Sequence, residues 1–312
     1  MPQFFFKPCS HEPIKLKVNY IRFGRKLSVY TFSIHLDSLE VHPLQQANTK
    51  RFLQVLNLLT PIFAGALPWV LLEGSGSWED TFIEPSLPKL LTPAPITFAI
   101  WGPIFILMAA FYVYQARDLL PGRENVEMPY VAQVGVFFFL SSVLTSLWYV
   151  AWARRMIWVS IAAMLLYLVA LLAAYFRLGI NTVPRSRRER LVVTAGWSMY
   201  TGWVAVAALV NTTTGLVYFG FDGLPFTELQ WTLGACAAAV IVYLVFLFER
   251  EDYVFAGVGA WAFIGLSITH LGPSPPSNQT VLTASLAGAA VITASMAYRY
   301  LDNVRRTRSR KK

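Results

Sequence analysis

The stretch IWVSIAAMLLYLVALLAAYF, residues 157–176, runs for twenty residues without a charged side chain. An α-helix of this length crosses the ~30 Å hydrocarbon core of a bilayer. Because backbone polar groups find no water there, each such run is expected to be helical. We therefore predict an all-α polytopic integral membrane protein with eight transmembrane helices. The predicted spans are residues 52–72, 96–116, 130–152, 157–177, 191–211, 228–249, 253–271 and 280–301.

The composition agrees with lipid as the solvent, because 55% of the 312 residues are hydrophobic and only 14% are charged. The net charge of +9 could suggest a nucleic-acid partner. However, the basic residues collect in short segments beside apolar runs, where they act as topology signals and contacts to anionic lipid. We therefore expect membrane lipid as a partner and no nucleic acid.

No catalytic or metal-binding constellation stands out in the sequence. Cys9 and Cys236 lack metal-ligand spacing, and three of the four histidines lie before residue 43. The predicted spans hold no acidic or basic residue well inside the membrane, which argues against a proton-coupled pump. We expect no metal site, no catalytic residues and no required cofactor.

Lys and Arg in the short loops predict the orientation. Basic residues flank the first span at Lys50 and Arg51, fill the loop at residues 185–190, and end the chain at residues 305–312. With eight spans, all three segments fall on one side, so both termini are expected to be cytoplasmic. Arg154 and Arg155 contradict this pattern, because their turn falls on the opposite side.

Residues 1–51 form a basic N-terminal tail that is expected to be disordered or to act as a targeting sequence. It is not a secretory signal peptide, because it has no sustained apolar core. The alternation over residues 28–41 favours a short strand.

The second span begins in proline-rich sequence, and Pro103 is expected to kink it because proline lacks an amide hydrogen. The preceding loop, residues 73–95, is either a passive linker or a cover over a pocket. Six tryptophans fall near predicted span ends and are expected to form interfacial belts. These are Trp69, Trp78, Trp148, Trp152, Trp158 and Trp231.

The fifth span carries a stripe at helical spacing. Tyr200, Trp203, Ala207 and Asn211 follow one another in steps of three and four residues, which places them on one face. Small Ala207 beside large Trp203 would leave a groove for a flat apolar ligand. Periodicity alone favours ordinary helix packing through a small residue.

These residues resemble the translocator protein family, also called tryptophan-rich sensory proteins or TspO/MBR proteins, over residues 52–211. Tyr200 to Asn211 is similar to the family pattern Tyr-x-x-Trp-x-x-x-Ala-x-x-x-Asn, and Trp101-Gly-Pro-Ile-Phe105 resembles the start of its second span. Phe105 stands where the family has Tyr. The glycine-spaced dimer face of the family is missing from the third span, where Gly135 stands alone. A homodimer is therefore possible but is not indicated by this span.

The resemblance implies a five-helix bundle with a hydrophobic pocket between spans one, two and five, covered by the first loop. The expected domains are the tail (residues 1–51), the TspO-like bundle (52–211), a three-helix membrane extension (212–301) and a basic cytoplasmic tail (302–312). The residues implied for ligand binding are Trp101, Phe105, Tyr200, Trp203, Ala207, Val210 and Asn211.

The expected function is binding of a hydrophobic ligand, such as a tetrapyrrole (porphyrin), a sterol or a lipid, as a sensor, carrier or scavenger. The first alternative is a small-molecule transporter that uses the three extra helices. The second is an enzyme that degrades its bound tetrapyrrole, which only the resemblance suggests, because the sequence offers no acid, base or metal set.

Overall fold

The computed structural model describes residues 16–23, 27–34, 43–72, 90–120, 122, 126–221, 226–272 and 275–309. The chain divides into two compact units, Met1–Thr49 and Lys50–Lys312.

The first unit contains a β-hairpin. Strand β1 (Leu16–Phe23) pairs antiparallel with β2 (Leu27–Ile34), and the register aligns Leu16 with Ile34. The strand predicted over residues 28–41 coincides with β2 as far as Ile34, and residues 35–42 lie outside the described part. The tail thus contains a pair of strands where the sequence suggested one.

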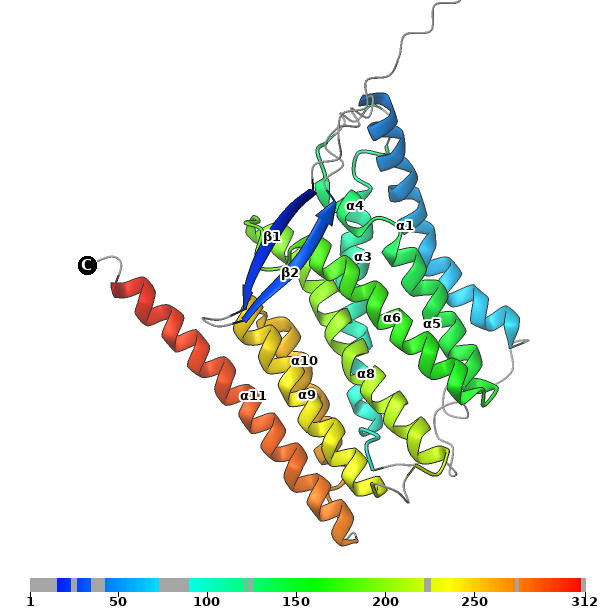
Figure 1. Cartoon of the computed structure of the whole chain (residues 1–312). Coiled ribbons are helices and arrows are strands. Elements are labelled where there is room, and N and C mark those ends of the chain that lie inside the picture. Colours follow the sequence, from blue (N-terminus) through cyan, green and yellow to red (C-terminus); the bar gives the residue numbers. More distant parts are fainter. Residues whose placement is uncertain are drawn as a thin grey trace, which may run out of the picture. The chain divides into compact units, whose positions relative to one another are not determined.

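The second unit is built from apolar helices (Figure 1). Their bounds are α1 (Pro43–Leu71, which begins in the first unit), the 3₁₀-helix η1 (Pro95–Ile100), α3 (Trp101–Gln115), α4 (Pro129–Val134), α5 (Phe137–Ala153), α6 (Ile157–Leu178), α7 (Arg187–Glu189), the π-helical turn η2 (Arg190–Ala195), α8 (Gly196–Tyr218), α9 (Glu228–Arg250), α10 (Tyr253–Thr269) and α11 (Pro276–Ser309).

The described helices confirm an integral, multi-pass, all-α membrane fold. Six segments are long and apolar enough to cross a bilayer: Ala47–Leu71, Pro95–Gln115, Ile157–Leu178, Arg187–Tyr218, Glu228–Arg250 and Ser277–Ser309. Two shorter apolar helices, Phe137–Ala153 and Tyr253–Thr269, occupy the positions of the third and seventh predicted spans. The count of eight spans stays a prediction.

The second and third predicted spans are each interrupted near their start. The 3₁₀-helix η1 continues directly into α3, so the change of helix type lies before Pro103, which occupies the first turn of α3. The kink predicted at Pro103 stays a prediction, since the change of helix type at Ile100 and Trp101 lies before this proline. In the third span, Gly135 has a φ of 54° and separates α4 from α5.

Helix α8 is the central element, because it packs against α3, α6, α9 and α10. Its glycines allow these close approaches. A Cβ atom at Gly215 would lie 2.4 Å from Ile161 of α6, and one at Gly202 would lie 3.3 Å from Val258 of α10.

The extension consists of α9, α10 and α11, with α10 packed against α8, α9 and α11. Small residues bring these helices together: a Cβ atom at Gly259 of α10 would lie 2.3 Å from Tyr243, and one at Gly288 of α11 would lie 2.8 Å from Phe263. Within the second unit, α11 and α1 lie on opposite sides (Figure 1).

Candidate functional site

A cavity of about 1510 Å³ lies among seven helices of the second unit. Helices α3 and α8 face each other across part of its wall, and α1, α5, α6, α9 and α10 complete it. The lining residues on α3 and α8 are Trp101, Ile104, Phe105, Met108, Ala109, Tyr112, Tyr200, Trp203, Val204, Val206, Ala207, Leu209, Val210, Asn211 and Thr214. Residues 91–95, which precede α3, and residues of α10 close part of the cavity at the end where α3 begins.

All seven residues singled out from the sequence line this one cavity: Trp101, Phe105, Tyr200, Trp203, Ala207, Val210 and Asn211. They come from two helices more than eighty residues apart in the chain, so only the packing of α3 against α8 brings them together. Whether they bind a ligand stays a prediction.

The aromatic rings of this set form a corner. The ring of Trp101 lies 6.4 Å from that of Trp203 and 5.9 Å from that of Tyr200, both nearly edge to face. Phe105 stacks on Trp101 at 5.3 Å and is 63% exposed. Tyr167 of α6 donates a hydrogen bond to the Tyr200 hydroxyl and fixes its orientation. Such a corner offers ring faces and edges to a flat apolar ligand.

Tyr200, Trp203, Ala207 and Asn211 lie on one face of α8, as their spacing predicts, and this face lines the cavity. Their side chains differ in size. Ala207 leaves space one turn beyond Trp203, and Asn211 adds a polar group one turn further. The side-chain oxygen of Asn211 has no hydrogen-bond partner among the described residues, although the residue is only 4% exposed. A ligand with a hydrogen-bond donor could satisfy it.

Two tryptophans that were assigned to the interfacial belts line the cavity instead. Trp148 and Trp152 are on the face of α5 that meets the cavity, together with Ser142 and Thr145. Trp158 behaves as expected of a belt residue, since it is 54% exposed and stacks on Phe219 at 4.5 Å. Position near a span end therefore did not separate lining residues from lipid-facing ones.

The cavity wall is also wider than the resemblance implied. Besides spans one, two and five, it includes α5 and α6, and it includes the extension through Ala235, Cys236 and Ala239 of α9 and Ala262, Phe263 and Leu266 of α10. Most of the loop predicted to cover the cavity, residues 73–89, lies outside the described part.

The described lining residues include no acidic or basic side chain. Ionised groups are costly to bury without a partner. A ligand held deep inside should therefore be uncharged there, with any ionised group near the opening. In the described part of the chain, no three His, Cys, Asp or Glu side chains gather as a metal site would require.

The connecting segment, residues 90–97, is attached to α10 by its backbone. The Ala94 amide donates to the Gly265 carbonyl at 3.0 Å, and Trp261 donates to the Thr97 carbonyl at 2.8 Å. Residues 91–95 of this segment line the cavity. The extension therefore positions the part of the wall that leads into α3.

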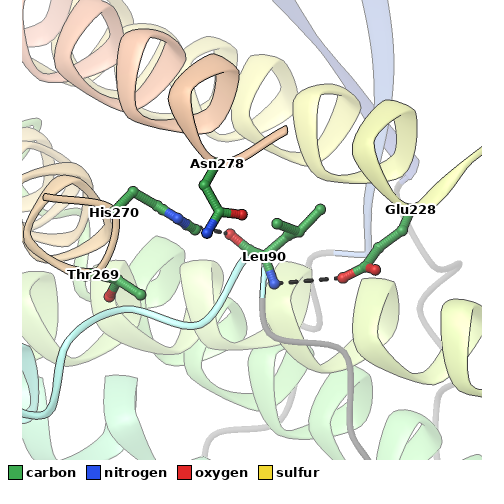
Figure 2. A pocket seen from close by; sticks show the side chains of 5 residues that line it. All are labelled: Leu90, Glu228, Thr269, His270 and Asn278. Carbon is green, nitrogen blue, oxygen red and sulfur yellow. Dashed lines mark hydrogen bonds between the residues drawn. The ribbon is translucent and has the colours of Figure 1, made fainter. Parts of the chain in front are cut away.

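A small polar pocket of about 280 Å³ lies beside the same segment (Figure 2). The His270 ring nitrogen Nε2 lies 2.9 Å from the Leu90 carbonyl, and the Leu90 amide donates to Glu228 at 3.4 Å. Thr269 lines both this pocket and the large cavity. His270 is the one histidine of the sequence outside the N-terminal tail, and its position at a span end gave no sign of these partners.

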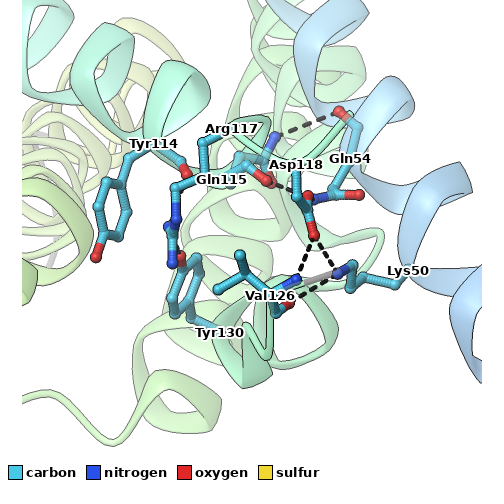
Figure 3. A network of polar contacts seen from close by, with 8 residues as sticks. All are labelled: Lys50, Gln54, Tyr114, Gln115, Arg117, Asp118, Val126 and Tyr130. Atoms are coloured by element: carbon cyan, nitrogen blue, oxygen red, sulfur yellow. Dashed lines mark hydrogen bonds and ion pairs between the residues drawn. The ribbon is translucent and has the colours of Figure 1, made fainter. Parts of the chain in front are cut away.

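At the opposite end of α3, a polar network joins α3 to α1 (Figure 3). Lys50 forms an ion pair with Asp118 at 2.5 Å, and Gln54 donates to the other oxygen of Asp118 at 2.7 Å. The amide of Val126 donates to the same carboxylate at 3.0 Å. Burial alone would raise the pKa of Asp118, but the hydrogen bonds from Lys50, Gln54 and Val126 hold this pKa below its ordinary value of 3.8.

The network continues toward the membrane through three buried amide side chains, those of Gln54, Asn57 and Gln115. Gln54 donates to the Gln115 carbonyl at 2.5 Å, and Asn57 donates to the Gln115 side chain at 3.1 Å. It pins α1 to the far end of α3. Beyond it, α1 contacts α5, where Phe63 meets Phe139 at 5.9 Å.

A second buried carboxylate, Asp252, joins the bundle to the extension. It accepts hydrogen bonds from Tyr175 of α6 at 2.7 Å and from Ser198 of α8 at 2.6 Å. It also caps α10 by accepting from the amides of Val254 and Phe255. The sequence placed Asp252 in a short turn and gave no sign of these partners.

A comparison with known protein families matches residues 57–298 to the family described as TSPO-like protein. The chain belongs to the TSPO-like protein family. The match passes through the bundle and continues across α9 and α10 into α11, so the extension of this TSPO-like protein is part of the family pattern. Comparisons with curated proteins and with solved structures found no match.

Proposed function

We propose that this TSPO-like membrane protein binds a flat hydrophobic ligand, of the size of a tetrapyrrole or a sterol, in the large cavity. The observation that carries the proposal is the meeting of the seven motif residues in one cavity whose described lining carries no charged side chain. Binding sites for small molecules are usually concave and mostly apolar, with a few polar groups that fix orientation. Asn211, Ser142 and Thr145 would supply such groups here.

The size of the cavity favours a large ligand. Typical ligand pockets measure about 300–1,000 Å³, whereas this one measures about 1510 Å³. The aromatic corner of Trp101, Tyr200 and Trp203 suits a conjugated ring system. The protein would act as a sensor, carrier or scavenger of that ligand, with no chemistry required of its own residues.

A protoporphyrin titration of the purified protein in detergent tests this proposal, with tryptophan fluorescence as the readout. We expect saturable quenching in the parent and a Kd at least about tenfold higher in Ala207→Phe, because the new ring fills the space beside Trp203. Trp203→Phe should reduce the amplitude of the quenching.

The control is Trp158→Phe, which removes an exposed tryptophan that does not line the cavity. It should leave the Kd unchanged. Quenching that is linear in ligand and equal in all variants would reflect partitioning into the micelle, and the tetrapyrrole proposal would then be abandoned.

Transport is the second candidate function, and the observation in its favour is that α9 and α10 form part of the cavity wall. The polar network at Asp118 and the aromatic rings of Tyr112 and Phe138, stacked at 5.1 Å, stand at the far end from the connecting segment. A carrier would have to open this end. Counterflow of labelled ligand in sealed vesicles would demonstrate transport, and binding without counterflow would argue against it.

A further inference from the structure

The side chains on the buried face of α9 change in size along the helix. Near the end of the helix, Tyr243 and Leu247 fill the interface, and Tyr243 donates a hydrogen bond to the Gly202 carbonyl at 2.9 Å. One and two turns earlier, the same face carries Ala239, Cys236 and Ala235. The bulky half is packed tightly against α8 and α10, whereas the half with small side chains borders the cavity.

Helix α10 adds a further small side chain to this part of the wall. Ala262 faces the cavity beside Phe263 and Leu266, and all three are buried. The four small residues Ala235, Cys236, Ala239 and Ala262 come from α9 and α10, the two helices of the extension that pack against α8. They define a part of the cavity that we call the extension lobe.

The position of side chains around α8 shows that the extension lobe and the rest of the cavity are continuous. At about 100° per residue, Val206 and Leu209 lie to one side of Trp203, and Ala207 and Asn211 lie to the other. All of them line the cavity. The cavity therefore extends around α8 on both sides of Trp203.

The side that carries Val206 and Leu209 is the one that meets the extension. Gly202 lies on this side, and a Cβ atom there would be 3.3 Å from Val258 of α10. On the other side Tyr200 bonds to Tyr167 of α6. Trp203 thus stands at the border between the extension lobe and the part of the cavity inside the bundle.

We propose that the extension lobe receives part of the same ligand, and that its four small residues determine how wide a ligand the protein accepts. This inference rests on the proposed function. It gives the three additional helices a role in specificity: they provide space for a rigid, uncharged ring system that extends past Trp203. Ionised substituents of such a ligand would remain outside the lobe, because its described walls carry no charge to pair with them.

Cys236 provides a direct probe of occupancy, because its thiol lines the lobe. In full-length Cys9→Ser protein, Cys236 is the remaining cysteine. We expect N-ethylmaleimide to alkylate it in detergent, and protoporphyrin at ten times its Kd to slow the reaction roughly tenfold, because only about one molecule in eleven is then empty.

A matched pair of substitutions on α9 tests the size of the lobe. Ala239→Phe should raise the Kd for protoporphyrin by roughly tenfold by filling the lobe, while Ala237→Phe places the same ring on an exposed position of the same helix. The Ala237→Phe protein should bind like the parent. If Ala239→Phe fails to fold, Ala239→Leu and the Cys236 reaction in protein without a cavity substitution still decide the matter.

The outcomes separate this inference from the proposed function. Saturable quenching in the parent, with Cys236 alkylated at the same rate with and without ligand and Ala239→Phe binding normally, would overturn the role of the extension lobe and leave the proposed function standing. Absence of saturable quenching in the parent would overturn both.

Discussion

At the scale of single residues, two buried carboxylates join elements that are distant in the sequence. Asp118 and Asp252 are 8% and 1% exposed, and each is surrounded by hydrogen-bond donors from other helices. A carboxylate held in this way stabilises the fold only as long as its partners are present, because an unpaired buried charge is costly.

Removal of Asp252 should weaken the attachment of the extension. We expect Asp252→Ala to lower the free energy of unfolding by roughly 2–4 kcal/mol, because the α10 cap and the bonds from Tyr175 and Ser198 are lost together. Denaturation in mixed micelles measures this. Glu249→Ala, at an exposed position in the last turn of α9, should change the value by less than about 0.5 kcal/mol. Equal effects of the two substitutions would contradict the proposed role of Asp252 in attaching the extension.

Asp118 should make stability depend on acid pH. Its pKa is lower in the folded protein than its ordinary value of 3.8, so the ionised carboxylate stabilises the fold above that value, and the contribution is lost as the pH falls through the folded pKa. The parent should have a higher Tm than Asp118→Asn at about pH 6, and the difference should shrink toward pH 3. A difference that is independent of pH would count against the assigned ion pair with Lys50.

At the scale of elements, the connecting segment before α3 depends on a close approach to α10. A Cβ atom at Gly265 would lie 1.9 Å from the Thr97 hydroxyl, so this glycine is required by contact and not by backbone conformation. The backbone bonds at Ala94 and Thr97 fix the segment in the same place. Two elements that are distant in sequence thus form one continuous wall.

Gly265→Ala should displace the connecting segment and lower stability by about 1–3 kcal/mol, the usual range for overpacking. Protoporphyrin binding should weaken as well, because residues 91–95 line the cavity. The same substitution at Gly257, where the nearest atom to a Cβ is 3.9 Å away, should have little effect on either quantity. Thermal unfolding and the quenching titration measure both, and parent-like values for Gly265→Ala would rule out the close contact.

At the scale of the whole membrane unit, the long apolar helices of the described part alternate in direction. The contacts of Lys50 with Asp118 and of Asp252 with Tyr175 lie at one end, and those of Leu90 with His270 lie at the other. The shorter helices α5 and α10 have 17 residues each, about the lower limit for a span. If both helices cross the membrane, the two termini lie on the same side as the loop at residues 185–190. If neither crosses, that loop lies on the opposite side from the termini.

Single-cysteine probes in a Cys9→Ser, Cys236→Ala background test both helices. Glu127→Cys and Met156→Cys flank α4 and α5, and Glu249→Cys and Leu271→Cys flank α10. With an impermeant maleimide on sealed, oriented membranes, the members of each pair should react from opposite sides, and the first member of each should share the cytoplasmic side with the termini. Reaction of both members from one side would reduce the number of spans.

The amino-acid sequence by itself determined that the protein lies in lipid and that its membrane segments are helical. Runs of about twenty apolar residues leave no alternative to helices in hydrocarbon, because the backbone must satisfy its own hydrogen bonds. The spacing of Tyr200, Trp203, Ala207 and Asn211 also placed them on one face, since 3.6 residues per turn is a local property. The family resemblance was visible in the same residues.

Only the tertiary structure decided what surrounds these residues. Trp148 and Trp152 lie near a span end like Trp158, yet they face the cavity because α5 presents that side to α3 and α8. Cys236 and the partners of Asp252 depend on which helices are neighbours, and such contacts join segments far apart in the chain. Helical periodicity fixes the face of a residue on its own helix, but the packing of whole helices fixes what that face meets.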